Sequence, residues 1–235
     1  MQRRDFLIFA AASGLLSGTA APVAGTALSL PVAINKSGRL RMLSLRGAKA
    51  WLLLVQGVLP ERAKSILAQS LASFEQILGE LKTLQPGDDI RGLAQTLDQE
   101  WRAYRPLLAD VRADPKAVWS HSEAVLAAAQ ALTVAYEKAA GTSSGKLVNL
   151  SGRQRMLSQR MAKAYLFRQM GVNTAEAGSM LDAAMKEFAK AHDDLKAAPQ
   201  STAQIKSELA LVEQQWFFFQ NALQMRAATD RVKAA

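Results

Sequence analysis

The sequence predicts an all-α protein, an antiparallel bundle of about seven helices built from a duplicated unit. Only 6% of the 235 residues are aromatic, and alanine, leucine, glutamine, lysine and arginine dominate, a composition that favours helix. A segment from Ile34 to Arg46 returns 114 residues later as Val148 to Arg160, which indicates two copies of one unit. Apolar residues recur at every third or fourth position, for example at Leu67, Leu71, Phe74, Leu78 and Leu81.

Proline, glycine and capping residues divide the chain into the predicted helices. The first helix is expected to end before Pro60, and the second at Gln85-Pro86-Gly87. Asp114-Pro115 places an N-cap residue before a proline at the first helical position, and the glycine-containing stretch 141–145 ends the helix that begins there. The expected ranges are 34–58, 61–84, 88–111, 115–140, 147–171, 174–197 and 201–229.

The repeat predicts how the chain is organised. The two copies extend over about 34–110 and 148–225, because weaker matches such as Trp101 with Trp216 follow the strong one. The second copy has no clear equivalent of the fourth helix, so we expect the pseudo-symmetry to be incomplete. The predicted domains are a signal peptide at 1–27, a first helical unit with its connecting helix at 28–140, and a second helical unit at 141–235.

The N-terminus has the pattern of an export signal. Gln2-Arg3-Arg4-Asp5-Phe6-Leu7 resembles the twin-arginine signal, and an apolar run with small residues follows it. An ordinary secretory signal and an uncleaved N-terminal anchor are the alternatives. The resemblance implies a periplasmic protein exported by the twin-arginine route. No later segment reaches about 18 uninterrupted apolar residues, so no membrane span is expected in the mature chain.

Charge and composition exclude several classes of function. The net charge is +9, which suits an anionic ligand. Nucleic acid is not expected as a partner, because the tryptophans are spread singly and the location is periplasmic. The chain has no cysteine, and its two histidines, His121 and His192, show no metal-ligand spacing. We expect no metal, no cofactor and no enzymatic activity.

The repeated helix has two distinct faces when it is drawn with 100° per residue. Arg41 shares one face with small and apolar residues, and Arg155 does the same in the second copy. The neighbours of these arginines are Ser37, Gly38, Ser44, Ala48 and Leu52, and in the second copy Ser151, Gly152, Ser158, Ala162 and Leu166. A separate polar face carries Asn35, Arg39 and Arg46, and in the second copy Asn149, Arg153 and Arg160.

An arginine on a small, apolar face needs a partner, because burying an unpaired guanidinium group is costly. If the two copies pack about a pseudo-two-fold axis, Arg41 and Arg155 face each other, and a planar oxyanion between them would accept parallel hydrogen bonds. The small residues would leave a slot, and the four serines would add hydroxyl donors. The alternative for Arg41 and Arg155 is a buried salt bridge to an Asp or Glu. The alternative for Asn35 and Asn149 is helix capping, and for the remaining arginines it is a solvated or capping face.

The repeated motif resembles two families of sensory domains. The sequences INKSGRLRMLSLR and VNLSGRQRMLSQRMAKAYL are similar to the P box of NarX-type nitrate and nitrite sensor kinases. They are also similar to the N-terminal domain of PilJ-type chemoreceptors of type IV pilus systems. In the nitrate sensors the arginine of the Arg-Met pair holds the ligand between two subunits. The resemblance therefore implies a ligand-binding role for Arg41 and Arg155 within one chain.

Two readings of function follow. The first is a periplasmic protein that binds or senses a small inorganic anion, nitrate or nitrite, and presents it to a membrane sensor, transporter or chemoreceptor. It predicts that Arg41 and Arg155 face each other across a closed slot. The second is a ligand-free helical interaction module, an accessory of a chemosensory or type IV pilus system. It predicts that carboxylates bind both arginines and that an apolar stripe is exposed.

Overall fold

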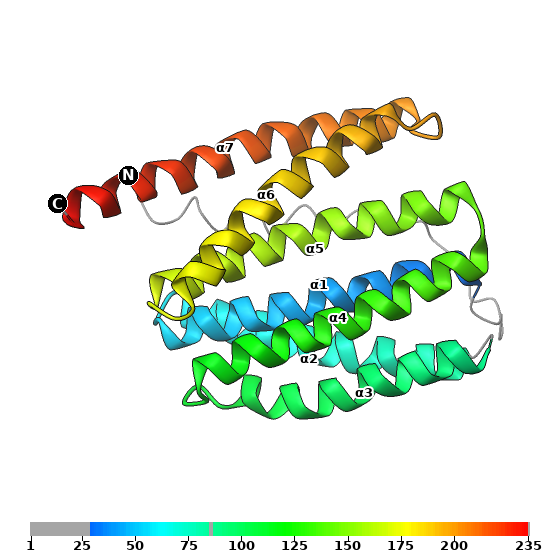
Figure 1. Ribbon diagram of the computed structural model, residues 1–235, viewed down its shortest axis with the longest axis horizontal. Helices are drawn as coiled ribbons and strands as arrows, with labels where there is room; N and C mark the ends of the chain where they lie inside the picture. The colour runs from blue at the N-terminus through cyan, green and yellow to red at the C-terminus, as the bar shows by residue number, and fades with distance from the viewer. Residues whose placement is uncertain (1–28, 85–86, 235) are drawn as a thin grey trace. The chain divides into compact units, whose positions relative to one another are not determined.

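The computed structural model describes residues 29–84 and 87–234, without the side chains of residues 222–234. This part of the chain contains seven helices and no strand, which confirms the predicted all-α fold (Figure 1). The helices are α1 (Leu30–Val55), α2 (Pro60–Thr83), α3 (Asp88–Ala109), α4 (Pro115–Ala140), α5 (Ser143–Gln169), α6 (Thr174–Ala197) and α7 (Ala203–Ala234). The predicted signal peptide, 1–27, lies outside the described residues.

The two repeated helices begin four residues earlier than the sequence pattern suggested. Helix α1 starts after Ser29, with Pro31 in its first turn, where the missing N–H of proline has no intrahelical partner to lose. Helix α5 starts after Thr142, whose hydroxyl accepts from the Gly145 backbone N–H at 3.1 Å. Asn35 and Asn149 therefore lie inside the helices and do not cap them. Asp114 caps α4, as its Asp-Pro sequence predicts.

Both repeated helices end in the same turn. Gly57 and Gly171 have positive φ angles of 65° and 72°, which glycine adopts without steric cost. The next residue returns its N–H to a carbonyl five residues earlier, as Val58 does to Leu53 at 2.8 Å and Val172 to Phe167 at 3.1 Å. This glycine-terminated turn closes a helix and reverses the chain, so the repeat conserves the connection to α2 and to α6 as well as the helix itself.

The described chain divides into two compact units, residues 29–195 and residues 196–234. Within the first unit α1 is central and packs against α2, α4 and α5. Helices α1 and α5 run parallel, because Gly145 lies beside Ile34 at their N-terminal ends and Gln56 Nε2 donates to the Leu166 carbonyl near their C-terminal ends. The expectation that the two repeated helices pack together is confirmed.

Aromatic residues fill the core of the first unit. Trp101 stacks on Phe74 with ring centroids 3.7 Å apart, and Tyr104 meets Trp101 edge-on. Trp51 is fully buried and donates its indole N–H to the Asp110 carbonyl at 2.8 Å. The stacked rings and the Trp51 hydrogen bond tie α3 to α1 and α2.

The second unit consists of the end of α6 and helix α7. Lys196 forms an ion pair with Glu213 at 2.8 Å. Trp216 and Phe219 are buried, whereas Phe217 and Phe218 are 61% and 71% exposed. None of the described helices is long and apolar enough to cross a membrane.

Candidate functional site

The two copies of the repeat meet at a pair of glycines. The Cα of Gly38 lies 3.9 Å from the place that a Cβ on Gly152 would take. Both guanidinium groups converge on this contact. Arg41 Nη2 lies 3.0 Å from the Cβ position of Gly38 and 3.2 Å from that of Gly152, and Arg155 Nη2 lies 3.7 Å from the latter. The fold thus brings together the two glycines and two arginines that the sequence singled out.

Arg41 is fully buried and is held only by neutral oxygen atoms. Its Nη1 donates to Gln130 Oε1 of α4 at 2.5 Å, and its Nη2 donates to Asn149 Oδ1 of α5 at 2.7 Å. A longer bond of 3.4 Å reaches the Asn149 carbonyl. The Nε atom of Arg41 is buried without a hydrogen-bond partner. Arg41 therefore joins α1 to α4 and α5, and its Nε donor stays unused.

The second copy repeats this contact in the opposite direction. Arg155 Nη2 of α5 donates to Asn35 Oδ1 of α1 at 2.8 Å. Asn35 and Asn149 occupy equivalent positions in the repeat, and so do Arg41 and Arg155. Each arginine thus binds the asparagine of the other copy. The environments differ, because Arg155 is half-buried and Arg41 is fully buried.

The charge of this cluster is not balanced by direct ion pairs. Among the side chains that the structure describes, neither Arg41 nor Arg155 forms a salt bridge. Burial, followed by the charges of Arg153 and Arg155, lowers the pKa of Arg41 to about 10, against the opposing effect of Glu137. Glu137 is reached only indirectly, because Asn149 Nδ2 donates to its carboxylate. At neutral pH both guanidinium groups carry their charge, so the cluster retains an excess of positive charge.

The four candidate serines donate within their own helices. Ser37 Oγ donates to the Ala33 carbonyl at 2.8 Å, and Ser44 Oγ to the Arg41 carbonyl at 2.9 Å. Ser151 Oγ and Ser158 Oγ donate to the carbonyls of Val148 and Arg155 in α5, each at 2.9 Å. In this arrangement their hydroxyl groups satisfy backbone carbonyls and point no proton toward the arginines.

The polar face of the repeated helix forms ion pairs in the second copy only, among the described side chains. Arg153 pairs with Glu187 of α6, and Arg160 pairs with Glu123 of α4 at 2.7 Å. Arg39 and Arg46, their equivalents on α1, form no ion pair with any described side chain. Burial lowers the pKa of Arg46, and the charge of Arg39 adds to the effect.

The sequence analysis did not predict that residues of α4 and the two lysines Lys49 and Lys163 belong to this cluster. Glu123, Gln130 and Glu137 are spaced by seven, which places them on one face of a helix, and they bind arginine, lysine or asparagine side chains of the repeat. Lys163 is fully buried, and its Nζ bonds to Glu123 Oε1 at 2.6 Å and to Ser122 Oγ at 2.8 Å. The heptad spacing and the repeated Ala-Lys-Ala of Lys49 and Lys163 were the available signals.

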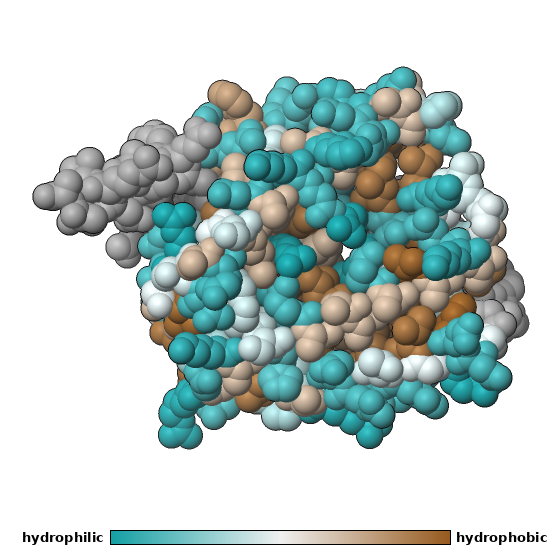
Figure 2. Space-filling model, in the orientation of Figure 1, coloured by the Kyte–Doolittle hydropathy of each residue, from teal (hydrophilic) through white to brown (hydrophobic). Residues whose placement is uncertain are grey.

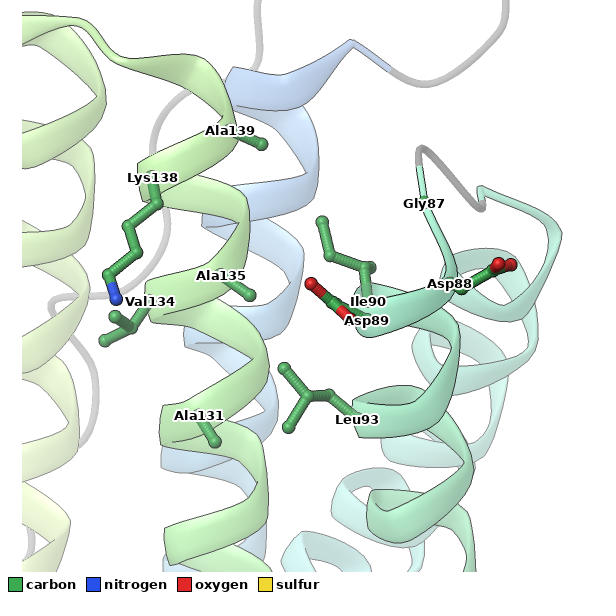
Figure 3. Close-up of a pocket in the computed structure, with 10 residues that line it drawn as sticks. All are labelled: Gly87, Asp88, Asp89, Ile90, Leu93, Ala131, Val134, Ala135, Lys138 and Ala139. Carbon is green, nitrogen blue, oxygen red and sulfur yellow. The ribbon is translucent and has the colours of Figure 1, made fainter.

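A separate hollow lies between the start of α3 and the end of α4 (Figure 3). Its walls are mainly apolar, with Ile90 and Leu93 of α3 facing Ala131 and Ala135 of α4. Brown and pale residues lie at this place on the face seen in Figure 2. None of the candidate residues from the repeat lines this hollow. Among the described residues, no group of histidine, aspartate and glutamate side chains suits a metal ion.

Comparison with known families gives one match. The chain matches the PilJ family, described as type IV pili methyl-accepting chemotaxis transducer N-term, over residues 26–137 and again over residues 139–235. The two matched ranges contain the two copies of the repeat. No curated protein and no solved structure matches the sequence.

Proposed function

Given that this chain belongs to the PilJ family of type IV pili methyl-accepting chemotaxis transducer N-terminal domains, we propose that it is a sensory module that binds a small planar oxyanion between Arg41 and Arg155. The N-terminal domains of this family are typically periplasmic sensory domains, and they are not enzymes. Nitrate and nitrite are the leading ligands. A membrane chemoreceptor, sensor or transporter would receive the signal.

The observation that carries the proposal is that Arg41 is fully buried without a carboxylate partner among the described residues. A fully buried guanidinium group normally lies against a carboxylate, because desolvation of an uncompensated charge is expensive. Here the direct partners are the amide oxygens of Gln130 and Asn149, and Nε has none. A second arginine, Arg155, lies at the same glycine contact. An anion would supply the missing negative charge and accept the unused N–H.

The reciprocal asparagine contacts suggest how an anion would enter. Amide oxygens bind guanidinium groups more weakly than charged oxygens do. An oxyanion would therefore displace Asn149 from Arg41, or Asn35 from Arg155, and bridge the two groups. Because each of these bonds links α1 to α5, their exchange would alter the contact between the parallel helices. A change of helix contact is a signal that a partner domain can read.

The test is thermal unfolding of the protein titrated with nitrate, nitrite, sulfate and chloride at constant ionic strength. A ligand that binds only the native state raises the melting temperature with its concentration. We expect a selective rise with nitrate or nitrite that Arg155→Gln abolishes. Arg102→Gln, at an exposed arginine of α3, is the matched control and should keep the response. A flat or unselective response in the unmodified protein would reject the proposal.

Export by the twin-arginine route is also part of the proposal, supported by the Arg3-Arg4 pair and the apolar run after it. Replacing both arginines with lysine should keep the protein in the cytoplasm. Unchanged appearance in the periplasm would point to the ordinary secretory route instead.

The second candidate function is a ligand-free interaction module for a chemosensory or pilus system. The observation in its favour is the pair of adjacent exposed phenylalanines on α7, Phe217 and Phe218. Large apolar side chains in the open often mark contact surfaces. A flat anion titration, together with binding to a pilus or chemoreceptor component that Phe217→Ser/Phe218→Ser removes, would favour this function.

A further inference from the structure

Helix α4 covers one side of the α1–α5 pair, and the repeat allows this side to be compared with its counterpart on the other side. Glu123 of α4 accepts hydrogen bonds from both Arg160 and Lys163 through its two carboxylate oxygens. Gln130 accepts from Arg41, and at 3.4 Å from Arg153. Seven residues further on, Glu137 accepts from Asn149. One helix face thus satisfies a row of polar groups that runs the length of the repeated helices.

The equivalent row on α1 has no such cover within residues 29–195. Lys49 is the counterpart of Lys163, and Arg46 is the counterpart of Arg160. Lys49 is only 9% exposed, yet no described side chain forms a hydrogen bond or ion pair with it. Burial, followed by the charges of Arg46 and Arg62, lowers the pKa of Lys49 to about 8. A buried amine beside two arginines lacks the carboxylate that its counterpart has.

Burial of the neighbouring residues shows the same asymmetry. On α1, the residues that share the face of Arg41 are buried, and α4 packs on this helix. On α5, the equivalent residues are open: Ser151 is exposed, and Arg155, Ser158, Ala162 and Leu166 are half-buried. Asn35 and Arg39 are exposed, whereas Asn149 and Arg153 are half-buried. The two-fold mate of the α4 position is therefore a half-exposed face of α5, with Arg46 and the buried Lys49 of α1 beside it.

We propose that this face receives a helix of a partner protein that carries acidic and amide side chains seven residues apart. Charge complementarity selects this occupant, because Arg46 and Lys49 form no ion pair with any described carboxylate. The pattern of α4 defines the fit: a glutamate would bridge Arg46 and Lys49, and an amide one heptad later would meet Arg155. Small and apolar residues of α5 would pack against the apolar stripe of the incoming helix. The inference stands on the repeat geometry and does not require that an anion binds.

A synthetic peptide that copies α4, residues 114–141, serves as the probe. Its binding to the full chain can be followed by the anisotropy of a fluorophore on its N-terminus. We expect saturable binding that weakens at least tenfold when the protein carries Lys49→Met or when the peptide carries the Glu123→Lys change. The pair of reversed charges, Lys49→Glu in the protein with Glu123→Lys in the peptide, should recover most of the lost affinity.

Two controls distinguish binding at this face from binding elsewhere on the protein. Lys64→Met removes an exposed lysine of α2 and should leave the affinity unchanged. If the peptide merely displaced the resident α4, affinity would depend on Lys163 and not on Lys49. Absence of saturable binding, or binding that Lys49→Met does not weaken while circular dichroism shows a folded variant, would overturn the proposal. The peptide test depends on Lys49 and the anion titration on Arg155, so failure of one test does not decide the other.

Discussion

Gly38 and Gly152, at equivalent positions of the two repeats, meet where α1 packs on α5, with the Gly38 Cα 3.9 Å from the Cβ position of Gly152. The absence of both side chains creates the space that the Arg41 guanidinium group occupies. Each glycine is thus explained by the arginine beside it, since neither has a backbone angle that demands glycine.

Gly38→Ala is expected to lower stability. The new Cβ would lie 3.0 Å from Arg41 Nη2, which is held in place by Asn149 and has no open space to move into. The control is Gly79→Ala at an exposed position of α2. Nothing lies within 4 Å of the Cβ position there, so this variant should gain about 0.5–1 kcal/mol of stability. In urea unfolding, the free energy of unfolding of Gly38→Ala should be about 1–3 kcal/mol lower than that of the control. Equal gains in both variants would show that Arg41 is free to move.

Arg41→Ala should cost more stability than Arg155→Ala, although the repeat makes them equivalent. Removing Arg41 leaves a cavity in the core and takes a donor from the half-buried side chains of Gln130 and Asn149, which we expect to cost about 3 kcal/mol. Arg155 is half-buried and donates a hydrogen bond to the exposed Asn35, so its loss should cost about 1 kcal/mol. Chemical denaturation of both variants gives the comparison. Similar losses would contradict the asymmetry of burial described above.

Glu123→Gln should destabilise the protein strongly through Lys163. The fully buried Lys163 would lose its only carboxylate partner among the described residues, and stranding a buried charge costs several kcal/mol; we expect about 2–4 because Glu123 itself is partly exposed. Glu75→Gln, which breaks the exposed pair with Arg105, should cost less than about 1 kcal/mol. Adding Lys163→Met to Glu123→Gln should restore most of the loss in a double-mutant cycle.

Stability should rise with pH above about 8 because of Lys49. Its pKa is lowered to about 8 in the folded protein, against an ordinary value of 10.5. Between these values the unfolded chain binds more protons than the folded one, so the free energy of unfolding increases with pH. Lys49→Met should raise stability at pH 7 by about 1–3 kcal/mol and flatten this part of the pH profile.

The free energy of unfolding should be measured between about pH 7 and 9.5. Above that range, Tyr104 and Tyr136 oppose the rise, since burial raises the pKa of both phenols and keeps them protonated in the folded state. Lys163, with a pKa also lowered to about 8 by burial, contributes a rise of its own. A Lys49→Met profile identical to that of the unmodified protein would show that Lys49 titrates normally.

The sequence by itself determined the helical class, the seven segments and the duplication, because each has a local cause. Apolar periodicity sets the buried faces, proline and glycine end the helices, and a repeated motif folds into a repeated turn, as Gly57 and Gly171 show. The sequence also identified Arg41, Arg155, Gly38 and Gly152 as candidates. An arginine on a helix face of small residues is expected to be buried, and a buried guanidinium group needs a polar partner.

Only the tertiary structure decided the partners of these residues and the difference between the two copies. Sequence spacing predicts which residues share a face, but it does not state which helix will cover that face. Helix α4 covers Arg41 and supplies the carboxylate that pairs with Lys163, whereas Arg155 stays half-buried and no described carboxylate pairs with Lys49. Two nearly identical motifs therefore acquire different burial, charge balance and pKa values, because desolvation depends on the neighbours that pack against a side chain and not on its own sequence.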